Sequence, residues 1–256
     1  MIPVFFKIGP LPVYSFGVMV LLAFLGGAAL VLRELKRRGI KPDHLEGYPF
    51  AAIVGGIVGA RLYWVLTSLD RVVDDPVRSI FGSSGLTWYG GLIGGALAAL
   101  WLARRHRQNL WSLCDAFAPG LAAAYGIGRI GCQLSGDGDY GPPSDLPWAM
   151  SYEKGMVPTE PGVLVHPTPI YEILMMIPIV FLLWRLRLQE RAPGWLFGAY
   201  LALVGVERWI SELYRDRGPW DLTLGMSTAQ WLSIAVILGG LWLLIDRRQA
   251  PTRVAT

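Results

Sequence analysis

The chain has 256 residues, of which 53% are hydrophobic and 16% are charged, and its mean hydropathy is +0.42. These values exclude an ordinary soluble domain, in which about 25% of the residues are charged. The net charge of +4 would suit a nucleic-acid partner, but the basic residues form four separate groups instead of one patch. We therefore expect an integral membrane protein that binds no nucleic acid.

Seven stretches have the length and composition of transmembrane helices, which need roughly 20 mostly apolar residues. In chain order they cover about 12–32, 47–67, 86–103, 112–131, 168–184, 194–214 and 228–245. They predict an all-α, polytopic membrane protein built as a bundle of about seven transmembrane helices. Because no repeat or flexible hinge divides the chain, we expect a single transmembrane domain over residues 1–256.

Basic residues gather after the first, third, fifth and seventh stretches. They are Arg33, Lys36, Arg37, Arg38 and Lys41; Arg104, Arg105 and Arg107; Arg185, Arg187 and Arg191; and Arg247, Arg248 and Arg253. Cytoplasmic loops carry an excess of Lys and Arg, so this pattern predicts an N-terminus outside and a C-terminus inside. The segment of about 132–167 is then extracytoplasmic. Its prolines and aromatic residues suit either a lid or docking segment or an ordinary connector.

Closely spaced glycines occur in several stretches, as at Gly55 and Gly59 and again at Gly90 and Gly94. In lipid, small residues four positions apart let helix backbones approach closely. A second interpretation is that these glycines leave backbone amides accessible and make room for a ligand. The sequence leaves both interpretations open.

Charged side chains at membrane depth are the strongest functional signal, because each costs at least ~2.5–3.5 kcal/mol to insert. Arginines occur in the second, fourth and sixth stretches, and acids in the fifth and sixth. These residues are Arg61, Arg129, Arg208, Glu172, Glu207 and Glu212. One hypothesis is that the acids simply neutralise the arginines. The other is that guanidinium groups bind a phosphate through paired hydrogen bonds, and at this depth the phosphate would be that of a phospholipid headgroup.

Several motifs, in order and over nearly the full length, resemble the bacterial prolipoprotein diacylglyceryl transferase family, with phosphatidylglycerol as the lipid donor. They lie at 9–10 with 14–17, 55–63, 89–94, 128–141 and 166–172, and at Arg208 with Glu212. The resemblance implies a transferase that moves diacylglyceryl from phosphatidylglycerol to the lipobox cysteine in the signal peptide of a prolipoprotein. This reaction is the first step of bacterial lipoprotein maturation, and it needs neither cofactor nor metal. The implied location is the cytoplasmic (inner) membrane, with the active site facing outward.

The resemblance also assigns site residues. It implies that Arg129, Arg208 and Tyr89 are catalytic. It implies a substrate-binding set of Arg129, Arg208, Arg61, Gly141, Glu172, Glu212, Tyr14 and His166. Glycerol phosphate is the leaving group, so guanidinium groups could stabilise the charge that develops on it.

The sequence departs from the family pattern at the site, so we expect a divergent member. Tyr89 stands where the family has the histidine of its His-Gly-Gly motif, and at neutral pH a phenol accepts a proton less readily than an imidazole. His166 is a candidate to replace that histidine. Other departures from the signature are Cys132, Gln133, Ser135 and Asp137. A paralogue with an altered acceptor or lost catalysis is therefore an alternative.

Two unrelated classes compete with the transferase. Residues 136–139 satisfy the Gly-x-Gly-Asp pattern of intramembrane aspartyl proteases, which need a second aspartate, and Asp115 at the opposite end of the fourth stretch is the available candidate. A transporter or other anion-binding membrane protein could use the same arginines. Transporters commonly consist of two related halves, however, and the sequence shows no such repeat.

Overall fold

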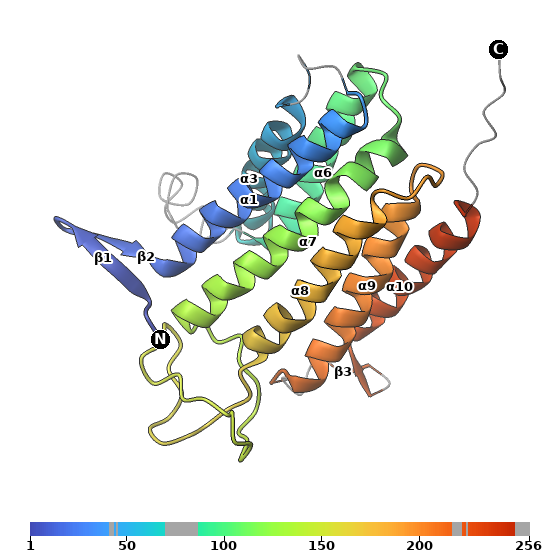
Figure 1. The fold of residues 1–256 in the computed structure, drawn as a ribbon. Helices are drawn as coiled ribbons and strands as arrows, with labels where there is room; N and C mark the ends of the chain where they lie inside the picture. The colour runs from blue at the N-terminus through green and yellow to red at the C-terminus, as the bar shows by residue number, and fades with distance from the viewer. Residues whose placement is uncertain (41–43, 45, 70–86, 217–221, 224, 249–256) are drawn as a thin grey trace, which may run out of the picture. The chain divides into compact units, whose positions relative to one another are not determined.

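The computed structural model describes residues 1–40, 44, 46–69, 87–216, 222–223 and 225–248 (Figure 1). Within them lie seven α-helices: α1 (Ser15–Arg37), α3 (Gly47–Thr67), α6 (Trp88–Arg105), α7 (Leu110–Ser135), α8 (Thr168–Leu186), α9 (Trp195–Ser211) and α10 (Thr228–Asp246). They confirm the seven predicted helices one for one. Lys41, Arg253 and the predicted start of the third stretch at 86 lie outside the described residues.

Four of these helices, α1, α3, α8 and α10, are each long and apolar enough to cross a membrane. The chain is therefore an all-α polytopic membrane protein. That α6, α7 and α9 also cross, and that the N-terminus lies outside, stay predictions. Basic residues do occupy the last turns of α1, α6 and α8, as the charge pattern requires.

Two small antiparallel hairpins accompany the helices and were not predicted. Strands β1 (Val4–Ile8) and β2 (Leu11–Tyr14) are joined through Gly9, whose φ of 58° suits glycine. Strands β3 (Leu222–Thr223) and β4 (Met226–Ser227) precede α10. Ser227 also begins α10 with a capping box, in which its hydroxyl accepts a hydrogen bond from the backbone of Gln230.

The chain forms two compact units. The first comprises Met1–Leu30 and Cys114–Thr256, and the second comprises Val31–Leu113. The boundaries therefore fall within α1 and α7. The single transmembrane domain expected from the sequence stays a prediction.

In the second unit, α3 packs against α6 through glycines. A Cβ atom at Gly55 would lie 2.7 Å from the carbonyl oxygen of Gly94, and one at Gly94 would lie 2.7 Å from the Cα of Gly59. Real side chains do not fit at such distances, so these glycines permit the close approach of the two helices. The packing interpretation of these glycines is confirmed.

We expect Gly94→Ala to lower the free energy of unfolding by about 1–3 kcal/mol, because the added methyl group overpacks the interface between α3 and α6. Gly91→Ala is a matched control in the same helix, where a Cβ would meet its nearest atom, the carbonyl oxygen of Gly56, at an ordinary 3.5 Å. Thermal unfolding of both variants in detergent would test this. Equal stability of the two would contradict the packing argument.

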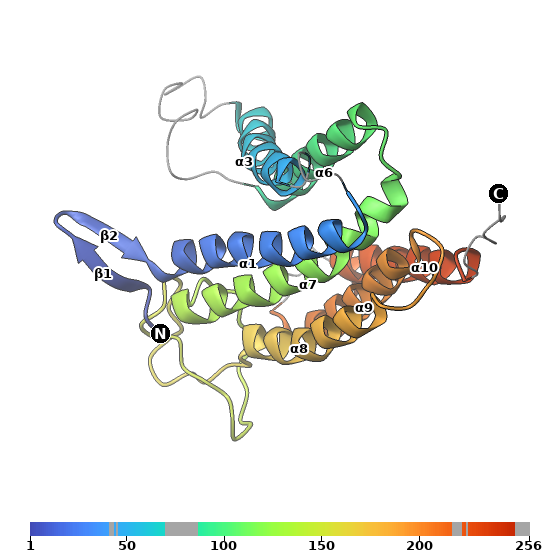
Figure 2. The same ribbon diagram turned by 45° about the horizontal axis from the view of Figure 1, so that its top comes forward.

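In the first unit, α7, α8 and α9 share a core, and α9 also packs against α10 (Figures 1 and 2). Small residues again allow close contact, since a Cβ at Gly27 of α1 would lie 3.0 Å from the carbonyl oxygen of Gly120 in α7. Asp115, near the start of α7, is buried and accepts hydrogen bonds from the backbone nitrogens of Gly194 and Phe197. It therefore satisfies orphan donors at the beginning of α9.

Because α7 continues to Ser135, the long connection to α8 begins at 136 and not at about 132. This connection is anchored on the end of α7. Met156 donates a backbone hydrogen bond to Ser135, and the fully buried Tyr152 donates its hydroxyl hydrogen to Oε1 of Gln133 over 2.7 Å. The connection thus holds a fixed position at the end of α7 where Arg129 lies.

Candidate functional site

Arg129 lies near the end of α7 and makes contacts in two directions. Its Nε forms an ion pair with Oε2 of Glu172 in α8 at 2.7 Å, and its Nη1 donates to Asp139 in the connection that follows α7. The guanidinium group also lies over the ring of Tyr125, 5.1 Å from the ring centroid. Only 15% of the side chain is exposed, so a fixed positive charge faces the inside of the helix bundle.

Arg208 lies in the last turn of α9 and is held on one side. Its Nη2 contacts Oε2 of Glu212 at 2.7 Å, the pairing expected for residues four apart on a helix. Its Nη1 lies farther from its neighbours, 3.9 Å from Oε1 of Glu172 and 3.4 Å from the Ser211 hydroxyl. This nitrogen is thus less firmly engaged than the other.

Glu172 lies between these two arginines. Its side chain is fully buried one turn into α8, and each of its carboxylate oxygens faces one guanidinium group. The Tyr125 hydroxyl donates to Oε1 of Glu172 over 3.4 Å. Glu172 therefore fixes the relative positions of Arg129 and Arg208.

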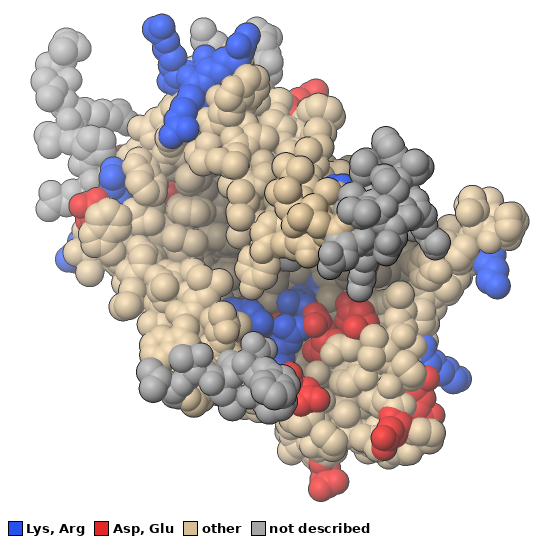
Figure 3. Space-filling view, turned by 180° about the vertical axis from the view of Figure 1, so that it is seen from behind, with Lys and Arg blue, Asp and Glu red and all other residues tan. Residues whose placement is uncertain are grey.

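A third arginine completes the cluster. Arg215 follows the short 3-10 turn Glu212–Tyr214 and forms an ion pair with Asp139. The same carboxylate also pairs with Arg129 through its other oxygen. Three arginines and three acids thus form one continuous network, which we call the arginine cluster: Arg129, Arg208, Arg215, Asp139, Glu172 and Glu212. Figure 3 shows acidic and basic side chains side by side near the middle of one face, with further charged side chains toward its edges.

Glu207 is the third of the acids that the sequence predicted to neutralise the arginines, and it is not a member of the arginine cluster. It is 1% exposed and lies within electrostatic range of Glu172, Arg129 and Arg208. Neither of its oxygens has a hydrogen-bond partner in the part of the chain that the structure describes. The prediction that acids pair with the arginines is thus confirmed for Glu172 and Glu212, but Glu207 forms no such pair within that part of the chain.

Gly141 and His166 lie together at a junction beside the arginine cluster. The backbone nitrogen of Gly141 donates to the carbonyl of His166, and a Cβ at Gly141 would overlap the carbonyl oxygen of Tyr214. His166 Nδ1 lies 3.1 Å from the Tyr171 hydroxyl, which also accepts a hydrogen bond from Trp148. Gly141 therefore allows the connection to pass against the residue that precedes Arg215.

The remaining predicted site residues lie elsewhere. Tyr14 ends β2 opposite Val4 and is about half exposed. Arg61 and Tyr89 belong to the second unit, Arg61 on α3 with its guanidinium over the Trp64 ring and Tyr89 at the exposed start of α6. Their roles in substrate binding and catalysis stay predictions.

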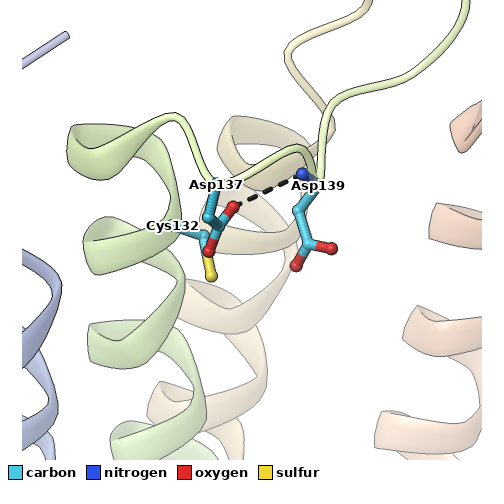
Figure 4. A group of neighbouring side chains, drawn as sticks. All are labelled: Cys132, Asp137 and Asp139. Carbon is cyan, nitrogen blue, oxygen red and sulfur yellow. Dashed lines mark hydrogen bonds between the residues drawn. The ribbon is translucent and has the colours of Figure 1, made fainter. Parts of the chain in front are cut away.

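Cys132, Asp137 and Asp139 form a compact group at the end of α7 (Figure 4), with their ligand atoms within 4.8 Å of one another. The backbone nitrogen of Asp139 donates to the Asp137 side chain over 3.3 Å. Such spacing could suit a metal ion. However, two guanidinium groups already hold Asp139, and their positive charge opposes a cation at this position.

The aspartyl-protease hypothesis also fails on geometry. Asp115 binds the backbone at the start of α9, whereas Asp139 pairs with Arg215 beyond its end. The 17 residues of α9 separate these points by about 25 Å at ~1.5 Å per residue. Two carboxylates that share a proton must instead lie in contact.

The unusual signature residue Gln133 acquires a structural role, because it accepts the hydroxyl hydrogen bond of Tyr152. Burial raises the pKa of that tyrosine to about 12, so the phenol stays protonated and keeps donating this bond at any physiological pH. This departure from the family pattern therefore reflects how the connection is attached to α7.

The sequence did not predict two members of the arginine cluster, Arg215 and Asp139. Arg215 stands seven residues after Arg208 and three after Glu212. That spacing could have indicated a common face, but the residue lies beyond the apolar stretch. For Asp139 the sequence indicated only the Gly-x-Gly-Asp pattern of a protease.

In a helical membrane protein, a cluster of largely buried arginines is typical of a site with a function, such as the binding of an anion. The family model for prolipoprotein diacylglyceryl transferase matches residues 3–246. The chain belongs to this family, which confirms the resemblance noted in its motifs, and it is therefore a transferase.

Similar proteins cover nearly the whole chain. One from Clostridium tetani is 32% identical over 96% of this chain and 98% of its own length. One from Geobacter sulfurreducens is 32% identical over 96% of both, and one from Nostoc sp. is 34% identical over 97% of this chain and 92% of its own length. All three carry the name phosphatidylglycerol–prolipoprotein diacylglyceryl transferase.

Proposed function

We propose that this protein transfers diacylglyceryl from phosphatidylglycerol to the lipobox cysteine of prolipoproteins, at the extracytoplasmic side of the bacterial inner membrane. The observation that carries the proposal is the arginine cluster, which lies among membrane helices and gathers three guanidinium groups around shared carboxylates. The donor is an anionic lipid. Its phosphate would reach such a site from within the bilayer.

The chemistry requires charge stabilisation at the phosphate. The cysteine sulfur attacks the glyceryl carbon that carries the phosphate ester, a carbon–sulfur bond forms, and the carbon–oxygen bond to phosphate breaks. The thiol proton passes to a base, and glycerol phosphate leaves with the electron pair. Arg129 and Arg208 would stabilise the charge on that leaving group with hydrogen-bond donors that are already held in position. Arg215, which shares the Asp139 carboxylate with Arg129, would add a third donor.

The acids would position the arginines. Glu172 contacts both Arg129 and Arg208, and Glu212 holds Arg208 from the other side. Positioning lowers the cost of organising the site at the moment of reaction. Gly141 and His166 would shape the junction at which the connection meets the cluster, and Arg61 and Tyr14 would contribute to substrate binding from their own elements.

Covalent turnover tests the proposal. The purified protein, in vesicles that contain phosphatidylglycerol, is incubated with a peptide that carries a lipobox cysteine, and the peptide mass is measured. We expect the mass to rise by one diacylglyceryl group, and no increase with a peptide in which serine replaces the cysteine. Absence of the adduct, together with flux of an anion across the vesicle membrane, would instead support the transporter hypothesis.

Tyr89 is the predicted base that accepts the thiol proton. We expect Tyr89→Phe to lower kcat by about 10²-fold, the lower end of the usual contribution of a general base, because the ring stays but the hydroxyl is lost. The same peptide assay measures the rate. Tyr63→Phe on α3 is a control for loss of an exposed tyrosine hydroxyl in the second unit. Full activity of the Tyr89 variant would exclude a role for Tyr89 in proton transfer.

A further inference from the structure

Asp139 has an unusual position within the arginine cluster. One oxygen of its carboxylate pairs with Arg129 and the other pairs with Arg215. Two anionic oxygens, each facing a separate guanidinium group, reproduce the arrangement that the two non-bridging oxygens of a phosphodiester would adopt there.

The charges of the cluster already balance. Its three arginines face three acids, with Glu207 as a further buried acid nearby. A phosphodiester added to this arrangement would leave a negative excess in a poorly hydrated place, which is unfavourable. An anionic lipid can therefore bind well only if one of the acids gives up its place.

Asp139 is the acid that can move at least cost. Its side chain is 34% exposed, whereas those of Glu172 and Glu212 are 0% and 8% exposed. Glu172 is fixed within α8, while Asp139 lies in the connection just after Gly138, which has a φ of 95°. When Asp139 swings outward, water can solvate its carboxylate.

Displacement of Asp139 would leave the rest of the site intact. Arg129 contacts Glu172 through Nε and Asp139 through Nη1, so loss of the second contact leaves Nη1 with only its weak 3.5 Å hydrogen bond to Cys132 Sγ, while the first contact still holds the side chain. Arg215 would be freed at the same time. Both guanidinium groups would then face the vacated position.

We propose that, in the protein without lipid, Asp139 occupies the position of the donor phosphodiester between Arg129 and Arg215, and that the anionic lipid must displace it. Asp139 thereby sets the affinity for the donor, an inference that rests on the proposed function. The apparent affinity of a ligand falls in proportion to the fraction of protein in the competent state. Removing the competing carboxylate therefore strengthens lipid binding.

The test compares lipid binding by the full-length wild type, Asp139→Asn and Asp139→Glu in detergent. Phosphatidylglycerol is the probe, and diacylglycerol, which lacks the phosphate, is the neutral control. Asp139→Asn keeps the shape but loses the charge, so we expect its Kd for phosphatidylglycerol to fall about tenfold. Asp139→Glu keeps a negative charge and should stay within about threefold of the wild type. Asp145→Asn, at an exposed acid of the same connection, is the matched control and should not change the Kd.

A second measurement uses the wild type alone and so does not depend on the folding of a variant. Hydrogen exchange of the backbone amide of Asp139, which donates to Asp137, should accelerate when phosphatidylglycerol is added and not when diacylglycerol is added. An unchanged or higher Kd for Asp139→Asn, or unchanged exchange in the wild type, would overturn the inference. Adduct formation by the wild type would still uphold the proposed function, whereas its absence would refute that function whatever the binding results.

Discussion

Arg129→Lys should lower kcat/KM for diacylglyceryl transfer by about 10³-fold, the upper end of the usual cost of removing one preorganised donor at a developing oxyanion. The guanidinium group of Arg129 contacts Glu172 through one nitrogen and Asp139 through another. A lysine ammonium is a single point of charge and cannot hold both directions at once. The variant therefore keeps the charge but loses the planar fork that would bind phosphate.

The fold should tolerate this change, because lysine can still pair with the buried Glu172. Initial rates of adduct formation on the lipobox peptide measure the loss, and thermal unfolding checks the fold. Arg185→Lys in the last turn of α8, outside the arginine cluster, is the matched control and should retain full activity. Near-normal transfer by Arg129→Lys would remove Arg129 from the mechanism.

Hydropathy was sufficient to predict the helices, because lipid leaves backbone groups no partner except those within the helix itself. The ends were less predictable. Helix α1 runs to Arg37 and α7 to Ser135, several residues beyond their apolar stretches. Backbone hydrogen bonding continues where the side chains have become polar, and hydropathy does not register it. The β1–β2 hairpin was missed because its apolar strands resemble the helix that follows.

The arginine cluster was predictable only where its members lie in apolar helices. Arg129, Arg208 and Glu172 stand out because charge is costly there, and the spacing of Arg208 and Glu212 predicted their pairing. Which acid Arg129 contacts depends on the packing of α7 against α8, a long-range contact. Asp139 and Arg215 lie in polar segments, where a charge is ordinary and gives no signal.

The structure also changes the choice between ion pairs and an anion site. Both hypotheses used the same arginines, and the ion pairs are present. These ion pairs still leave guanidinium groups available to an anion. One of the acids, Asp139, is a partly exposed loop residue, and Nη1 of Arg208 lies 3.9 Å from Glu172. The buried acids set the position of the arginines, and the exposed acid leaves room for exchange with a ligand.

Glu172→Ala should lower the free energy of unfolding by about 3–5 kcal/mol, the usual cost of removing one partner from a buried ion pair. Glu172 is fully buried and faces both Arg129 and Arg208. Its removal leaves two positive charges close together with one counter-charge fewer, in a place where water cannot easily replace it. Transfer should fall as well, because Arg129 loses the contact that fixes its direction.

The double variant Glu172→Gln with Arg129→Gln separates the charge effect from packing. It removes one charge of each sign and keeps side chains that can hydrogen-bond, so it should recover most of the stability lost in Glu172→Ala while remaining inactive. Denaturation in detergent measures stability, and the peptide assay measures transfer. If the double variant were as unstable as Glu172→Ala, packing around Glu172 and not its charge would hold α7, α8 and α9 together. Recovery of stability without recovery of transfer would show that the same charges serve both the fold and the reaction.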